Sequence, residues 1–316
     1  MELLLNIGYI SVAIAVIIVS SNILITNASA VASILKVPSI IVGTLLIGFG
    51  NALPELAISV ISALNGNTGI AIGNGYGSNL VNTGLVLGTI AVIAPLAVHR
   101  LLLIREMPWL FGSLLLATLA ISNGKLERLE SAVLLALCVT YTITSIRAGL
   151  KEPGSEEQSS GGKKELFIRI CMVLAGLAAL SLGSKLFIFS AVNLARMMKI
   201  SEEVIGISIV ALGTSLPELF SSVIAVVRKE NDLAIGNLVG ANIFNLLGVI
   251  GVAGVITPAA VDSSVLCTDA PVTLVMTLFL FVCTCSKKIT RINGIMLLLM
   301  YTVFISCMIG GMINQK

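Results

Sequence analysis

The chain has 316 residues, of which 57% are hydrophobic and 11% charged, and its mean hydropathy is +1.06. Soluble domains carry about 25% charged residues, so this composition excludes a soluble enzyme, a disordered chain and a disulfide-stapled secreted module. The net charge of +3 comes without a basic tail, and we expect no nucleic acid partner. The composition instead predicts an all-α polytopic membrane protein whose surface mostly contacts lipid.

Apolar runs long enough to cross a bilayer, which takes about 20 residues, recur along the whole chain. Ten of them are predicted as transmembrane helices: 3–25, 38–64, 69–95, 106–122, 129–148, 166–194, 203–227, 233–257, 266–286 and 291–312. The polar segment 149–165 is rich in Pro, Gly, Ser and charges and is predicted as a linker. It separates a first five-helix repeat, 1–148, from a second, 166–316.

The orientation follows from the basic residues of the loops. Lys and Arg are concentrated on the side of the membrane opposite the N-terminus, and such loops are cytoplasmic as a rule. We therefore expect a multi-pass protein of the cell (plasma or inner) membrane, with both termini outside the cytoplasm and the linker inside it. We expect neither a bound cofactor nor an obligate protein partner.

The two halves match without gaps when one is shifted by 163 residues. Residues 53–56 and 216–219 are both Leu-Pro-Glu-Leu, and residues 71–74 and 234–237 are both Ala-Ile-Gly-Asn. Each half has an odd number of spans, so the second enters the membrane with inverted orientation. Inverted repeats are typical of secondary transporters.

A Pro-Glu pair interrupts the apolar run of spans two and seven. Proline lacks an N–H and removes the helical donor of the carbonyl four residues earlier, here that of Gly50 and of Gly213. In hydrocarbon, a bound cation can satisfy such a carbonyl. Glu55 and Glu218 are the two acids predicted deep in the membrane, and ionisable residues there indicate a functional site.

Spans three and eight carry Gly- and Asn-rich motifs. Ser78 and Asn82 are four residues apart on one helix face and, with Asn245, can turn oxygens toward the glutamates. Asn79 and Asn242 are predicted to join helices rather than to bind ions. Calcium takes roughly 6–8 hard oxygen ligands, and no thiolate or imidazole accompanies these residues. The motifs predict a site for a hard cation.

The same charges suggest a mechanism. Two carboxylates close together in a low dielectric repel each other, so an empty site is unfavourable and has to hold calcium, monovalent cations or protons. If only filled states reorient, the passage of one ion is coupled to the return of another. A cation channel is the alternative from a different class, and it would take up ions without a counter-ion gradient.

Residues 213–218, Gly-Thr-Ser-Leu-Pro-Glu, resemble the G-T-S-x-P-[ED] motif of the sodium/calcium exchanger family, within the calcium/cation antiporter superfamily. The chain is most similar to its short prokaryotic members. The resemblance implies a transporter that is not an enzyme and exchanges several sodium ions for one calcium, with spans one and six sliding across a fixed core. It implies Glu55 and Glu218 as central ligands, and as further ligands Thr214, Ser215, Ser78, Asn82 and Asn245.

The first repeat departs from this motif. Asn51 and Ala52 replace its Thr-Ser pair, and Ala241 stands opposite Ser78 in the second repeat. Both changes delete a hydroxyl ligand, although Asn51 can offer its amide oxygen instead. Residues 50–52, Gly-Asn-Ala, are also similar to a motif of proton/calcium exchangers, so proton/calcium exchange stays an alternative. Asn245 stands where potassium-dependent relatives carry an acid, and no potassium requirement is expected.

Overall fold

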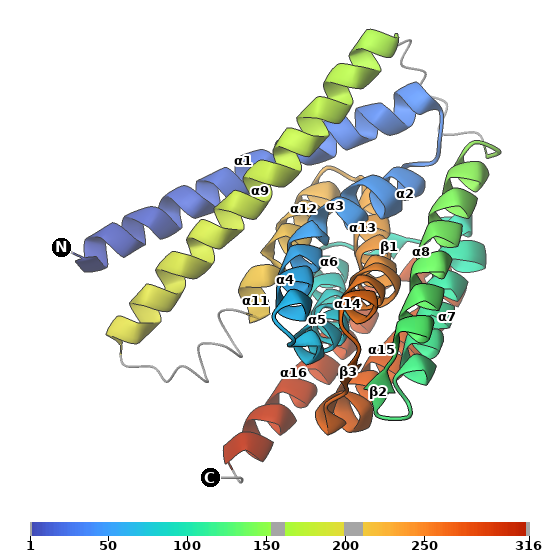
Figure 1. Cartoon of the computed structure of the whole chain (residues 1–316). Helices are drawn as coiled ribbons and strands as arrows, with labels where there is room; N and C mark the ends of the chain where they lie inside the picture. Colours follow the sequence, from blue (N-terminus) through green and yellow to red (C-terminus); the bar gives the residue numbers. More distant parts are fainter. Residues whose placement is uncertain (1, 153–161, 199–210, 314–316) are drawn as a thin grey trace. The chain divides into compact units, whose positions relative to one another are not determined.

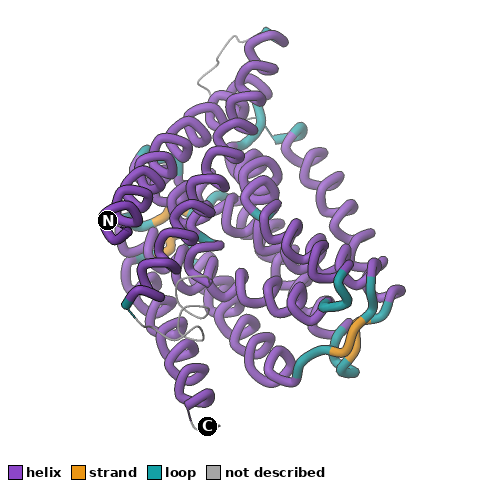
Figure 2. The backbone as a smooth tube through the Cα atoms, turned by 60° about the vertical axis from the view of Figure 1, so that its left-hand side comes forward, coloured by secondary structure: helices purple, strands orange, loops and turns teal. Residues whose placement is uncertain are grey.

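The computed structural model describes residues 2–152, 162–198 and 211–313, and nearly all of this backbone is helical (Figure 2). The α-helices are α1 (Glu2–Leu35), α2 (Ser39–Val42), α3 (Phe49–Asn51), α4 (Leu53–Leu64), α5 (Thr68–Leu80), α6 (Leu87–Ile93), α7 (Met107–Ala120), α8 (Arg128–Gly149), α9 (Lys163–Met197), α11 (Ala211–Thr214), α12 (Leu216–Val227), α13 (Asn231–Phe244), α14 (Ile250–Ile256), α15 (Ala270–Cys285) and α16 (Arg291–Ile313). Short π-helical turns continue several of them: η1 (Gly43–Gly48), η2 (Val81–Val86), η3 (Leu102–Glu106), η5 (Asn245–Val249) and η6 (Val265–Asp269).

The predicted spans correspond to these helices. Within the described residues, eight helical stretches are long and apolar enough to cross a membrane, and a bent pair makes a ninth. That pair, Ser39–Asn51 and Leu53–Leu64, bends by 41° just before Pro54, where the missing N–H interrupts the helix. The remaining predicted span, 203–227, is described only from Ala211 onward, and the linker residues 153–161 lie outside the described part.

The duplication is visible in the local structure. Helices α12 and α14 begin and end 163 residues after α4 and α6, and η6 does so after η3. Strands β3 (Ala259–Ala260) and β4 (Lys288–Ile289) follow β1 (Leu96–Ala97) and β2 (Lys125–Leu126) by the same interval. The antiparallel pairs β1–β4 and β2–β3 were not expected from the sequence, because two-residue strands have no detectable period.

The chain forms two compact units, which are described separately. Unit 1 consists of Met1–Pro54 and Thr144–Asn237. In it, α1 packs along α9 (Figure 1), and small residues at the contact let the backbones approach. A Cβ added at Gly176 would lie 3.2 Å from the backbone nitrogen of Leu24. The approach of α13 to α2 and η1 is closer still, since a Cβ at Gly236 would lie 2.6 Å from the carbonyl oxygen of Ile40.

Unit 2 consists of Glu55–Ile143 and Leu238–Lys316. Helix α5 packs against η5 and α14, and α6 packs against α16. Here too glycines set the spacing, because a Cβ at Gly294 would lie 2.7 Å from the carbonyl oxygen of Gly88. The core of this unit thus holds the Gly- and Asn-rich turns of both halves of the sequence.

Candidate functional site

The residues predicted to bind ions divide between the two units. Unit 1 contains Gly50, Asn51, Gly213, Thr214, Ser215 and Glu218. Unit 2 contains Glu55, Ser78, Asn82 and Asn245. No group of three or more His, Cys, Asp or Glu that could hold a metal ion occurs in the described part of the chain. Besides the two glutamates, the oxygens that these predicted residues offer are those of amides, hydroxyls and backbone carbonyls.

Glu55 in unit 2 lies in the first turn of α4, where the helix dipole favours a negative charge. Its side chain is 1% exposed, and neither carboxylate oxygen forms a hydrogen bond with another described residue. An ionised carboxylate buried without a partner costs several kcal/mol. The fold therefore presents two strong acceptors that a proton or a cation has to satisfy.

Asn82 and Asn245 lie on the π turns η2 and η5, and such turns are frequent at functional sites. Both side chains are fully buried. The Oδ1 of Asn82 and both polar side-chain atoms of Asn245 have no hydrogen-bond partner among the described residues. Ser78, one helical turn before Asn82, is also buried. These oxygens match the hard ligands that calcium and sodium prefer.

Asn79 and Asn242 join helices, as predicted from the sequence. The Nδ2 of Asn79 donates to the carbonyl oxygens of Gly75 (2.8 Å) and Asn242 (3.3 Å). The Nδ2 of Asn242 donates to Thr83 Oγ1 (3.0 Å), and its Oδ1 accepts from the Nδ2 of Asn82 (3.1 Å). The last bond fixes the orientation of the Asn82 amide, and the Oδ1 of Asn82 has no donor among the described residues.

In unit 1, Glu218 lies in the first turn of α12 and is 1% exposed. Ser215 is the N-cap residue of that helix and is buried, yet its hydroxyl makes no capping hydrogen bond. Thr214 is half-buried, and Gly213 is buried. The start of α12 thus repeats the placement of Glu55, with a proline at its second position.

A hydrogen-bond network in unit 1 was missed by the sequence analysis. Asn51 Nδ2 donates to Ser221 Oγ (3.0 Å) and to Asn237 Oδ1 (2.9 Å). Asn237 Nδ2 in turn donates to Ser221 Oγ (3.0 Å) and Ser222 Oγ (2.9 Å). Ser221 Oγ donates to the carbonyl oxygen of Pro217 (2.6 Å). The network therefore connects α3, α12 and α13 through buried side chains.

A signal for part of this network is present in the sequence. Ser222 and Asn237 lie 163 residues after Ser59 and Asn74, and the Nδ2 of Asn74 likewise donates to Ser59 Oγ (3.4 Å). The Ser and Asn that recur in both repeats therefore form the same hydrogen bond in each repeat. Ser221 has no such counterpart, and nothing in the sequence indicated it.

The expectation for Gly50 rests on the proline that follows it. Pro54 has no N–H and cannot be the helical donor of the Gly50 carbonyl oxygen. The backbone N–H of Ala52, the C-cap residue of α3, donates to the carbonyl oxygen of Gly48 (3.1 Å). The carbonyl oxygen of Gly50 therefore stays a candidate ligand.

A third buried acid, Glu106, was not singled out from the sequence. Glu106 on η3 is fully buried, accepts a hydrogen bond from Tyr141 Oη (2.5 Å) and has Arg105 Nη1 at 3.5 Å. Trp109 packs edge-on against the Tyr141 ring, with centroids 5.4 Å apart. Tyr141 thus donates to Oε2, and the Arg105 guanidinium balances the charge beside Oε1, which accepts no hydrogen bond from a described residue. Because protein groups pair with this carboxylate, we interpret it as part of the scaffold of unit 2.

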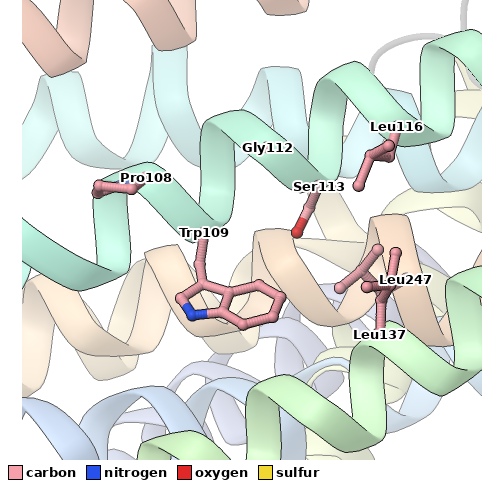
Figure 3. Close-up of a pocket in the computed structure, with 7 residues that line it drawn as sticks. All are labelled: Pro108, Trp109, Gly112, Ser113, Leu116, Leu137 and Leu247. Carbon is pink, nitrogen blue, oxygen red and sulfur yellow. The ribbon is translucent and has the colours of Figure 1, made fainter.

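Next to this cluster is an apolar cavity of about 230 Å³. Figure 3 shows its lining: Pro108, Trp109, Gly112, Ser113, Leu116, Leu137 and Leu247. The hydroxyl of Ser113 is the polar side-chain oxygen among them, and no carboxylate lines the cavity. It therefore lacks the ligands that a cation requires.

Comparison with known proteins agrees with this geometry. Residues 5–147 and 168–310 each match the family described as sodium/calcium exchanger protein. The chain is 32% identical over 303 residues to the "Putative antiporter CaxA" of Alkalimonas amylolytica, covering 93% of this chain and 95% of that protein. It is 29% identical over 297 residues to the inner membrane protein YrbG of Escherichia coli, covering 90% of each.

A solved structure has the same fold. The sodium-calcium exchanger NCX_Mj, from a crystal soaked with Na⁺ and Ca²⁺, superimposes with a TM-score of 0.83 at 27% identity, over 96% of this chain and 98% of that one. The described helices, the duplicated family match and this superposition agree on a polytopic membrane transporter rather than an enzyme. The chain belongs to the sodium/calcium exchanger family and is one of its cation/calcium antiporters.

Proposed function

We propose that this antiporter exchanges calcium for sodium across the membrane by alternating access. The observation that carries the proposal is Glu55, a buried carboxylate with no protein hydrogen-bond partner among the described residues. The same unit holds Asn82 and Asn245, whose buried amide oxygens also lack donors there. Such a set of bare oxygens is stable only when a hard cation or a proton occupies it.

We propose Glu55 and Glu218 as the central ligands of the transported ions. The further ligands in this proposal are Ser78, Asn82, Asn245, Thr214, Ser215 and the carbonyls of Gly50 and Gly213. Asn51 is assigned a supporting role, because both of its amide N–H groups are donated to protein acceptors. Charge explains the coupling, since two buried carboxylates oppose reorientation until a cation replaces the one that left.

Sodium as the counter-ion is supported by the solved relative, which is a sodium-calcium exchanger. Proton/calcium exchange is the second candidate, and one observation favours it. The first repeat has Asn51 and Ala52 where the second has Thr214 and Ser215, so two hydroxyl oxygens of the kind that bind sodium are absent. A carboxylate such as Glu55 can carry a proton without them.

For the membrane context, we propose the cell (plasma or inner) membrane with both termini outside the cytoplasm. The excess of Lys and Arg in the loops on the other side supports this orientation. Cysteine labelling of single-cysteine variants at each terminus in intact cells would test it, and protection of both termini from an impermeant reagent would contradict it.

The function is tested with purified protein in liposomes and radioactive calcium. Sodium-loaded vesicles diluted into sodium-free buffer should accumulate calcium, and vesicles with only a pH gradient should not. Calcium uptake in the pH-gradient vesicles alone would show that the counter-ion is the proton and not sodium. Uptake in vesicles without any counter-ion gradient would instead indicate a channel.

A further inference from the structure

The two repeats differ at two positions that are hydrogen-bonded to each other. A shift of 163 residues places Asn51 opposite Thr214, and it places Ser221 opposite Ile58. The amide that replaces a hydroxyl in the first repeat thus contacts a hydroxyl that replaces an apolar side chain in the second, with Asn51 Nδ2 3.0 Å from Ser221 Oγ.

All hydrogen-bond donors of this pair are engaged by the protein. An amide nitrogen has two N–H donors, and Asn51 gives one to Ser221 Oγ and the other to Asn237 Oδ1 (2.9 Å). Ser221 Oγ accepts from both amides and donates to the carbonyl oxygen of Pro217 (2.6 Å). Asn51 is 1% exposed and Ser221 and Asn237 are fully buried, so water does not compete for these bonds.

The network is anchored on the helix that carries Glu218. Pro217, Ser221 and Ser222 lie on α12 within four residues of Glu218, and Asn237 Nδ2 donates to Ser222 Oγ as well (2.9 Å). The close approach at Gly236 brings α13 into position for these bonds. Residues that orient a metal ligand typically change metal affinity by about 10- to 100-fold when they are altered.

We propose that Asn51, clamped to Ser221 and Asn237, positions the Glu218-bearing turn of α12 and lowers the number of monovalent cations exchanged per calcium. The amide N–H groups of Asn51 are held by Ser221 and Asn237, and the first repeat has no hydroxyl at the position where the second repeat has that of Thr214. This inference rests on the proposed function, because it assumes that a hydroxyl at this position serves as a ligand for sodium.

The test uses Asn51→Thr, which installs the residue of the second repeat, together with Ser221→Ala and the double variant. Each is reconstituted in liposomes, and two quantities are measured: the calcium concentration for half-maximal uptake, and the sodium ions exchanged per calcium, from the reversal potential. Asn51→Ser serves if Asn51→Thr does not elute as a monodisperse protein.

Both single variants are expected to raise the half-maximal calcium concentration about tenfold, within the range for altered ligand-orienting residues. The double variant is expected to have the same half-maximal calcium concentration as each single variant, because all three remove the hydrogen bond between Asn51 and Ser221. Only the variants with a hydroxyl at position 51 should exchange more sodium ions per calcium. A purely structural role would lower the amount of folded protein or the maximal rate while leaving the half-maximal concentration unchanged.

Two results overturn the inference. Affinity losses that multiply in the double variant would show that Asn51 and Ser221 act independently. An unchanged sodium count in Asn51→Thr would show that the amide does not limit the coupling. The unaltered protein tests the proposed function separately: if it is driven by protons, the inference requires that Asn51→Thr acquire sodium-driven uptake, and failure to do so contradicts it.

Discussion

The two compact units satisfy their buried polar groups differently. In unit 1, Asn51, Ser221 and Asn237 donate and accept among themselves and hold three helices together. In unit 2, Glu55 and the Oδ1 of Asn82 are as deeply buried, yet no described protein group donates to them. Buried polar groups are normally hydrogen-bonded, so the first pattern is typical of a scaffold and the second of a ligand site.

The largest expected effect comes from removing the bare charge. Glu55→Gln should abolish calcium uptake into sodium-loaded liposomes, because a neutral amide can neither balance a divalent cation nor carry a proton. Its thermal unfolding in ion-free detergent should occur at the same or a higher temperature, since the variant removes an unpaired buried charge.

The matched control for that experiment is Glu106→Gln. This carboxylate is also fully buried, but Tyr141 donates to it. We expect calcium uptake to be retained and the unfolding temperature to fall. If Glu106→Gln abolished transport as completely as Glu55→Gln, the contrast between bare and satisfied carboxylates would not separate site from scaffold.

A second contrast lies within one helix. Asn82→Ala removes the unsatisfied amide oxygen and should raise the calcium concentration for half-maximal uptake by about 10- to 100-fold. Asn79→Ala removes a satisfied amide, with bonds to the carbonyl oxygens of Gly75 and Asn242. It should leave that concentration within about twofold and cost about 1–3 kcal/mol of unfolding free energy. Equal effects of the two variants on calcium affinity would contradict these roles.

The same contrast explains what the sequence could predict. The spans follow from apolar length, and the broken helix at Pro54 follows from proline chemistry. Glu55 stood out because a charge in an apolar run is costly without a function. Groups with a protein partner give no such signal. Glu106 accepts a hydrogen bond from Tyr141, 35 residues away, and Ser221 accepts one from Asn51, 170 residues away. Such pairs exist only once the helices are packed.

The Asn51 network can be disturbed without touching a polar group. A Cβ at Gly236 would lie 2.6 Å from the carbonyl oxygen of Ile40 and 3.1 Å from the Cα of Gly43. Both neighbours are backbone atoms, which can move only if a helix shifts. Gly236→Ala should therefore destabilise the protein by about 1–3 kcal/mol. Chemical unfolding in detergent measures this, with Gly112→Ala as control because nothing lies within 4 Å of its Cβ. Equal stability of the two variants would mean that α13 lies farther from the backbone of Ile40 and Gly43 than these distances indicate.

The smallest expected effect tests the scaffold side of the comparison in unit 2. Tyr141→Phe removes the hydroxyl that donates to Glu106 Oε2 at 2.5 Å and keeps the ring that packs against Trp109. Leaving a buried acceptor without its donor costs about 1–3 kcal/mol, and Arg105 at 3.5 Å offsets part of this loss. We therefore expect a decrease near the lower end of that range, with calcium uptake unchanged. The double variant Tyr141→Phe with Glu106→Gln should lose less than the sum of the two single changes, because both changes act on the same hydrogen bond. Additive losses would show that the Tyr141 hydroxyl does not stabilise unit 2 through Glu106.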